Sequence, residues 1–257
     1  MIILAIGDVV GTPGCEYLRR RLPTIKKQYG VDFCIANGEN SAAGNGITPQ
    51  SADELFECGV DLITTGNHVY RRREIYERLD TCRDIIRPAN YYTGNPGKGV
   101  AVADMGSVKI GVINLAGNAF MDGSNNPFTC VDACLEEIKD CRIKLVDFHA
   151  EATGEKRALG FYLDGKVSAV FGTHTHVQTA DEQILPEGTG YITDLGMTGT
   201  VQSVLGVTPQ IIITKLKTNM PSRFDNNEGE CMLNGCLFEI DKQSGKTLSV
   251  QRINIRG

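Results

Sequence analysis

The stretch IILAIGD at residues 2–8 is a continuous apolar run that ends in a glycine and a carboxylate. A run of this kind is typical of a strand that is buried on both faces, as in the parallel sheets of α/β proteins. In such sheets, ligands bind in the crevice outside the carboxyl ends of the strands. The stretch therefore predicts an α/β fold and places Asp8 where a functional side chain would lie.

Four further apolar strands, expected at 33–36, 61–65, 143–148 and 167–171, end in the same way. The polar residues that follow them are, in chain order, Glu39, Asn40, Asn67, His68, His149, His174 and His176. All four histidines of the chain belong to this set. Five separate strand ends that supply Asp, Glu, Asn and His side chains are the pattern expected of a metal centre assembled from distant segments.

The segments between these strands predict the rest of the architecture. Helices are expected at 15–29, with a disturbance at Pro23, and at 49–58, 72–79, 130–141, 153–163 and 209–217. Antiparallel hairpins are expected at 99–105 with 108–115 and at 232–240 with 248–255, and short strands at 85–86 and 191–193. Because no repeat or low-complexity linker interrupts this order, we expect residues 1–257 to form one α/β domain with mixed sheets.

The composition excludes several classes of protein. The 257 residues carry a net charge of −5 and are 41% hydrophobic, which argues against general disorder and against broad nucleic-acid binding. No apolar stretch approaches the ~18–20 residues of a membrane span, and the first residues lack the basic cluster of a signal peptide. We therefore expect a cytoplasmic protein without a membrane partner.

The nine cysteines are odd in number and form no C-x-x-C pair, which argues against a disulfide framework. Cys130 and Cys134 have the i, i+4 spacing of neighbours on a helix, which would also suit a metal or redox pair. The favoured interpretation is that both are small apolar residues on a buried helix face.

Taken singly, each polar residue at a strand end has an ordinary explanation: a turn residue (Asp8, Glu39, Asn40), a helix cap (Asn67, His68) or a histidine satisfied within the core (His149). The pair His174 and His176 is the strongest single indication of metal ligation. On an extended segment, residues two apart point the same way, and two imidazoles are costly to bury without a partner. Jointly, the ordinary explanations require five coincidences at equivalent positions, so we favour metal ligation.

The mixture of ligand types narrows the choice of metal. Hard oxygen ligands combined with imidazole suit manganese, iron or zinc, and no thiolate belongs to the set. The number of ligands exceeds the three or four that one zinc ion takes. Two transition metals per chain that share a carboxylate fit better, with iron or manganese favoured. Metal pairs of this kind clamp the attacking and leaving oxygens of a phosphoester displacement.

The order of these motifs resembles that of the calcineurin-like metallophosphoesterase superfamily. The longer strings ANGEN (36–40), VDFHAEAT (146–153), GTHTHVQTAD (172–181) and YITDLGMTG (191–199) are similar to its bacterial YmdB-type branch. The resemblance runs from residue 1 to the terminal hairpin. It implies a four-layer α/β/β/α sandwich with mixed sheets, and a di-metal phosphodiesterase that acts on 2′,3′-cyclic or 3′,5′-cyclic nucleotides.

The resemblance also implies a role for each residue. One metal would be held by Asp8, Glu39, Asn40 and His176, and the other by Glu39, Asn67, His149 and His174, so that Glu39 bridges the two. A hydroxide that bridges the metals would attack phosphorus in line. His68 would lie over the substrate phosphate and protonate the leaving ribose oxygen as general acid.

Two departures from the wider pattern stand out. Val10 occupies the position of a first-motif histidine and cannot bind metal, so Asn40 is expected to replace it through its amide oxygen. The bridging residue is Glu39 rather than the more common aspartate. Within the branch, Asn118 stands where an arginine is expected, which removes one phosphate or base contact.

Neighbouring residues allow further interpretations. Arg71, Arg72 and Arg73 follow His68 closely and would add positive potential for an anionic substrate, although a solvated helix face is the favoured interpretation. Gly44 and Gly46 would let a loop approach the site, or simply form a turn.

Two other functions suit the same residues. The chain could be a phosphomonoesterase or nucleotidase on the same fold, or a non-catalytic nucleotide sensor. The expected substrate is a small nucleotide phosphodiester. A cyclic phosphate at the end of an RNA would be a larger substrate that carries the same phosphodiester group. The terminal hairpin offers an edge for assembly into a homo-oligomer.

Overall fold

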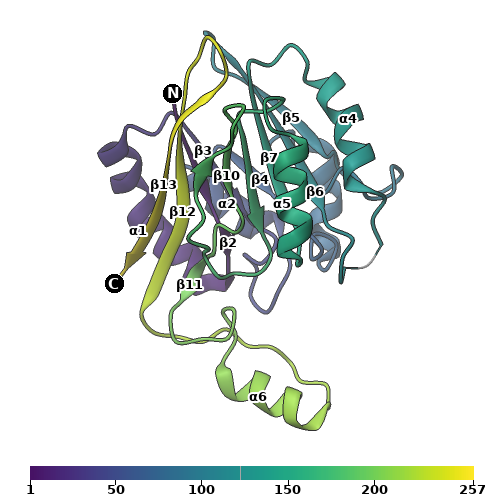
Figure 1. Ribbon diagram of the computed structural model, residues 1–257. Helices are drawn as coiled ribbons and strands as arrows, with labels where there is room; N and C mark the ends of the chain where they lie inside the picture. Colours follow the sequence, from purple (N-terminus) through teal and green to yellow (C-terminus); the bar gives the residue numbers. More distant parts are fainter. Residues whose placement is uncertain (122) are drawn as a thin grey trace.

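The computed structural model describes residues 1–121 and 123–257 and packs two mixed β-sheets between outer helices (Figure 1). The first sheet contains β1 (Ile2–Ile6), β2 (Asp8–Val9), β3 (Phe33–Asn37), β4 (Leu62–Thr64), β11 (Met197–Thr200), β12 (Cys231–Ile240) and β13 (Thr247–Arg256). The second has the order β5-β6-β7-β8-β10-β9 and contains β5 (Val100–Asp104), β6 (Lys109–Ala116), β7 (Ile143–His149), β8 (Ala169–Thr173), β9 (Gln183–Ile184) and β10 (Gly190–Ile192).

The helices are α1 (Gly11–Tyr29), α2 (Pro49–Glu57), α3 (Tyr76–Thr81), α4 (Pro127–Glu137), α5 (Thr153–Tyr162) and α6 (Pro209–Thr218). They form the two outer layers, except for α6, which lies outside the sandwich. Figure 1 shows α1 on one side of the sheets and α4 with α5 on the other. The contacts agree, because α1 lies against β11 and β12 whereas α4 lies against β6.

The burial pattern of β1 shows why four layers form. Ile3 and Ala5 pack between the two sheets, in one cluster with Leu145 of the second sheet. Leu4 and Ile6 point the other way and pack in the cluster beneath α1. Both faces of the strand are therefore buried, which explains why its sequence is apolar throughout rather than alternating. The expected α/β/β/α sandwich with mixed sheets is confirmed.

Several element boundaries differ from the prediction. Helix α1 begins at Gly11 and continues through Pro23, which lies on the exposed face of the helix. Helix α4 begins at Pro127 because the Asn126 side chain accepts from the backbone N–H groups of Phe128 and Thr129, and it ends at Glu137.

The short elements were the least predictable. Residues 85–86 form isolated pairings with Ile63 and Lys98 rather than a strand. The helix expected at 72–79 is divided into a 3₁₀ turn at Arg73–Ile75 and α3. Strands β2, β9 and β11 were not expected, since runs of two to four residues carry little periodicity.

Residues 201–230 leave the sandwich between β11 and β12, and we call this segment the excursion (Figure 1). It contains α6, none of whose residues is buried. A pairing between Val207 and Asn226 joins its outgoing and returning parts. The excursion then feeds directly into β12, which lies inside the sheet and pairs with β1, β11 and β13. Of the two strands of the terminal hairpin, only β13 lies at an edge of the first sheet.

No helix among the described residues combines the length and apolar character needed to cross a membrane.

A buried ion pair ties α5 to the segment after β10. Lys156 Nζ lies 2.7 Å from Asp194 Oδ2, and the two side chains are 2% and 1% exposed. The same carboxylate oxygen accepts from the backbone N–H and the hydroxyl of Thr175, and Asp194 Oδ1 accepts from Gly196 N. Asp194 is thus fully hydrogen-bonded, as a buried charge must be.

We expect Lys156→Met to lower the free energy of unfolding by about 3–5 kcal/mol, because it leaves the Asp194 carboxylate buried without its cation. Urea denaturation followed by circular dichroism measures this loss. The exposed Lys27→Met on α1 is the control and should change the free energy by less than about 0.5 kcal/mol. A loss for Lys156→Met as small as that of the control would show that the ion pair does not stabilise the fold.

Candidate metal centre

The structure brings all seven predicted ligands together at the carboxyl ends of strands from both sheets. Asp8 comes from β2, His149 ends β7, and the others lie in the loops that follow β3, β4 and β8. Asp8, Glu39 and His149 are completely buried. Carboxylates and imidazoles that are buried this close together lose their hydration. Hydrogen bonds among them, or a bound cation, must offset that loss.

One group of side chains surrounds the amide of Asn40. Its Nδ2 atom lies 3.4 Å from Asp8 Oδ1, 3.3 Å from Glu39 Oε1 and 3.3 Å from His176 Nε2. His176 Nε2 is itself 3.5 Å from Asp8 Oδ1. These four residues are the ones expected to hold the first metal.

A second group surrounds the ring of His149. Its Nε2 atom lies 3.2 Å from Glu39 Oε1, 2.9 Å from Asn67 Oδ1 and 3.1 Å from His174 Nδ1. Within the described residues, ligand atoms of Glu39, His149 and His174 all lie within 4.8 Å of one another. Because Glu39 Oε1 contacts both groups, its position suits the bridging role.

Hydrogen bonds to Nδ1, on the side of the ring that faces away from the cluster, fix the tautomer of His149. Thr173 Oγ1 donates to Asp147 Oδ1 at 2.7 Å, so it accepts from His149 Nδ1 at 2.9 Å. A neutral His149 ring therefore keeps its proton on Nδ1 and presents the lone pair of Nε2 to the cluster, which is the form that binds metal.

His176 is oriented in the same manner by the excursion. Its Nδ1 donates to the backbone carbonyl of Leu205 at 3.1 Å, which leaves Nε2 facing Asp8 and Asn40. Both imidazoles are therefore prepared as ligands by groups outside the cluster.

The segment that carries His174 and His176 is not extended, so the expected geometry was wrong there. Both residues have positive φ values, 96° and 63°, and their rings reach different groups. Such backbone is strained for a residue with a side chain and persists only when its surroundings hold it. Asp194 supplies that support, because it binds the backbone N–H and the hydroxyl of Thr175 between the two histidines.

Gly66 shows why glycine precedes Asn67 and His68. A Cβ atom built at this position would lie 2.2–2.4 Å from ring atoms of His149. Only glycine lets the loop after β4 approach the imidazole closely enough for Asn67 to reach Nε2.

The mutual interactions shift the pKa values of the cluster. Burial would raise the pKa of Asp8, but His176 and His149 outweigh it and hold that pKa well below its usual range. Burial would lower the pKa of His149, but Glu39 opposes it and raises the value to about 9. The pKa of Glu39 falls for the reciprocal reason. The carboxylates are thus ionised and stabilised by positive charge, a role that a bound cation would assume.

His68 occupies a different place from the other histidines. Its Nδ1 atom lies 2.8 Å from Asn40 Oδ1 and 3.4 Å from Glu39 Oε1, and its backbone N–H donates to Glu39 Oε2 at 2.8 Å. The ring lines a cavity, so Nε2 is the nitrogen left for a bound molecule. Burial lowers its pKa, which favours the neutral ring.

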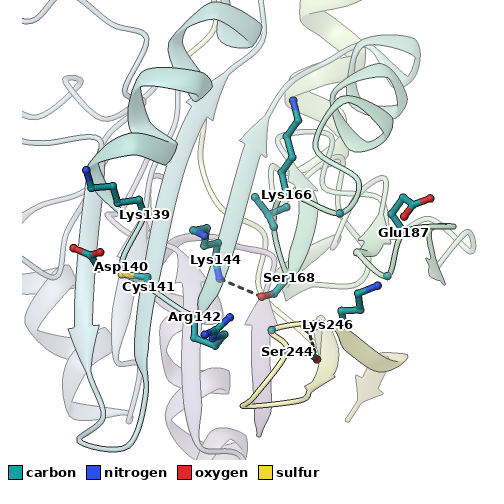
Figure 2. Close-up of a pocket in the computed structure, with 14 residues that line it drawn as sticks. Lys139, Asp140, Cys141, Arg142, Lys144, Lys166, Ser168, Glu187, Ser244 and Lys246 are labelled. Carbon is teal, nitrogen blue, oxygen red and sulfur yellow. Dashed lines mark hydrogen bonds between the residues drawn. The ribbon is translucent and has the colours of Figure 1, made fainter.

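The cavity beside His68 has a volume of about 360 Å³ and is lined by Glu39, Asn40, His174 and His176 together with apolar side chains. A separate cavity of about 450 Å³ lies at the opposite, amino ends of β7 and β8 (Figure 2). Its lining includes Lys144 and Ser168 but none of the predicted ligands.

The remaining predicted residues have simpler positions. Val10 lines the cavity beside the cluster, in agreement with its exclusion as a ligand. Arg72 donates to the carbonyls of Ala43 and Asn45 and so clamps a loop, which neither interpretation of the arginines foresaw. Asn118 is hydrogen-bonded to Ser124.

Cys130 and Cys134 lie together on α4, with their sulfur atoms 4.0 Å apart. Both pack in or against the core cluster on the outer face of the second sheet. This position agrees with small apolar residues on a buried helix face.

Sequence reasoning missed the residues that orient the ligands. A carboxylate inside an otherwise apolar strand was the available signal for Asp147, since such a residue must have a buried partner. No local signal marks Thr173, Asp194 or the carbonyl of Leu205, because their roles depend on contacts between distant segments.

Comparisons with known proteins agree with this geometry. A model of the family described as YmdB-like protein matches residues 4–253. The 2′,3′-cyclic-nucleotide 2′-phosphodiesterase of Bacillus subtilis (strain 168) is 46% identical over 256 residues, which are 99% of this chain and 97% of that protein.

Solved structures of similar proteins share the fold. A crystal structure described as a novel phosphatase from Mycoplasma pneumoniae superposes with a TM-score of 0.94 at 34% identity, over 100% of this chain and 93% of that chain. The NAD nucleotidase of Haemophilus influenzae, at 11% identity and a TM-score of 0.61 over 99% of this chain and 55% of its own, shares the fold alone. The chain has the metallophosphoesterase fold and belongs to the YmdB-like protein family.

Proposed function

We propose that this protein is a metal-dependent phosphodiesterase that opens nucleoside 2′,3′-cyclic phosphates. The observation that carries the proposal is the pair of ligand groups joined by Glu39, beside a cavity that His68 also lines. The name of the Bacillus subtilis relative supports the 2′,3′-cyclic substrate over the 3′,5′-cyclic one.

The residues present fit two metal ions. Asp8, Asn40 and His176 would hold one ion with Glu39, while Asn67, His149 and His174 would hold the other with the same carboxylate. The fit rests on the imidazole tautomers, which direct the lone pairs of His149 and His176 inward. Oxygen and imidazole donors without thiolate favour iron or manganese. When bound, two such ions lower the pKa of water and offset charge on the phosphate.

The amide of Asn40 determines which nitrogen of His68 carries the proton. As it stands, Asn40 Oδ1 accepts from His68 Nδ1 at 2.8 Å, and Nδ2 faces Asp8, Glu39 and His176. A half-turn of the amide would exchange these atoms, so that the oxygen serves as metal ligand and Nδ2 donates to His68 Nδ1. The proton of the neutral ring would then reside on Nε2.

A proton on His68 Nε2 is what the reaction needs. Opening the cyclic ester at the 2′ oxygen leaves a poor alkoxide leaving group, which must be protonated. We therefore assign His68 as general acid, with Nε2 donating the proton and Asn40 keeping it on that atom. The product would be a nucleoside 3′-monophosphate.

The metal centre yields the first prediction about function. Protein loaded with Mn²⁺ and freed of excess should contain close to two metals per chain by elemental analysis. Glu39→Gln should fall below about one, because the charge of this residue serves both ions, and circular dichroism would show that the fold persists. Full activity with at most one metal per chain would contradict the di-metal centre.

Asn40 yields the second prediction. Asn40→Ala should lose one metal and retain the other, since its amide contacts only one group of ligands. Turnover should fall as well, because His68 Nδ1 loses its partner. If metal content and turnover are both unchanged, Asn40 is not a ligand.

His68 yields the third prediction. His68→Ala should keep both metals and lose roughly 10²–10⁴-fold in kcat on a nucleoside 2′,3′-cyclic phosphate. The loss should be much smaller on a nitrophenyl phosphodiester, whose leaving group needs no proton. His149→Ala is the matched control and should lose metal together with activity on both substrates. An equal loss of His68→Ala on both substrates would assign the ring to electrostatic stabilisation of the phosphate.

A further inference from the structure

The cavity beside the metal centre has two chemically different walls. The side formed by the sandwich presents the polar residues of the cluster and His68. The opposite side comes from the excursion. Apart from Asn226 its lining is apolar and consists of Val204, Leu205, Val207, Ile212 and Phe224, which we call the apolar wall. The proposed hydrolysis of a phosphate ester uses only the first side, so the second requires its own explanation.

The apolar wall is open rather than packed. Leu205 is 45% exposed, and Ile212 and Phe224 are only half-buried. The ring of Phe224 contacts Lys215, whose Nζ lies 4.6 Å from the ring centroid. Exposed apolar side chains gathered at one cavity indicate a surface that a ligand covers.

Asn45, on the loop that Arg72 clamps, lines the same cavity. Its φ of 128° is unfavourable for a residue with a side chain, and its Oδ1 is buried without a hydrogen-bond partner among the residues that the structure describes. Backbone strain together with an unsatisfied polar atom is typical of a functional position. A donor on a bound molecule would satisfy this amide.

We propose that the apolar wall binds the nucleobase of the substrate, while the phosphate lies between His68 and the metal ligands. The inference rests on the proposed phosphodiesterase function and specifies its substrate as a mononucleoside cyclic phosphate. A volume of about 360 Å³ suits a ligand of this size. Because the wall itself offers apolar contact, both purine and pyrimidine bases should be accepted.

The wall is also fixed to the metal centre. Leu205 accepts from His176 Nδ1 through its backbone carbonyl, and the neighbouring Gly206 lies against Val10, where a Cβ atom would be 2.4 Å from Val10 Cγ1. The base-binding surface and the ligand His176 therefore have one common support. Truncating the Leu205 side chain leaves this carbonyl in place, which makes Leu205→Ala a clean test.

The test compares a substrate that has a base with one that lacks it. For Phe224→Ala and Leu205→Ala, kcat/KM on uridine 2′,3′-cyclic phosphate should fall about 5- to 150-fold, mainly through KM, as expected for loss of base contact. On glycerol 1,2-cyclic phosphate, which has no base, the change should stay within about twofold. Leu216→Ala is the control, because Leu216 lies on α6 at 73% exposure and does not line the cavity.

A binding measurement makes the result independent of turnover. By calorimetry, Phe224→Ala should bind uridine 3′-monophosphate at least fivefold more weakly than wild type and inorganic phosphate equally well. Asn45→Gly, which removes the amide and suits the positive φ, should behave in the same way.

Equal losses on the two cyclic esters, or unchanged binding of the nucleotide, would overturn the base-binding assignment. If the wild-type protein hydrolyses neither ester, the proposed function fails, and the nucleotide titration alone decides the role of the wall.

Discussion

The site depends on the burial of one carboxylate, Glu39, which has no exposure to solvent and still carries a negative charge. Three contacts offset the cost of that burial: the ring of His149, the amide of Asn40 and the backbone N–H of His68. His149 and His68 come from segments far from Glu39 in the chain. The two sheets must therefore pack correctly before the charge is stabilised, so the stability of the fold and the geometry of the site are coupled.

The strand ends explain why much of the site could be predicted. A strand buried on both faces is largely apolar, so the polar residues that follow it are conspicuous and lie at the edge of the sheet. This reasoning located Asp8, Glu39 and His149 from local sequence alone, and the structure brings them together. The alternation of strands and helices over the whole chain also predicted an α/β fold with mixed sheets, whereas the four layers were implied only by the family resemblance.

The rest could not be read locally. The turn that separates His174 from His176 depends on Asp194, which is held by Lys156 on α5, and no periodicity reveals such a chain of contacts. The apolar wall is formed by residues scattered along the excursion. They follow neither the helical nor the strand periodicity, so no sequence pattern marks them. Boundaries such as that of α4 depend on a single cap, so they shift by a few residues when the cap is overlooked.

The position of β12 has a consequence for how the protein is made. This strand is synthesised long after β1, yet it pairs with β1 from Ile2 to Ile6 and with β11, which in turn pairs with the short strand that contains Asp8. While the ribosome is still producing the middle of the chain, β1 has one neighbour and an open edge. Pairings of such long sequence separation form slowly and leave strands exposed to aggregation. The first sheet is therefore completed only after β12 has been synthesised, and the strand that contains Asp8 gains its support at the same late stage.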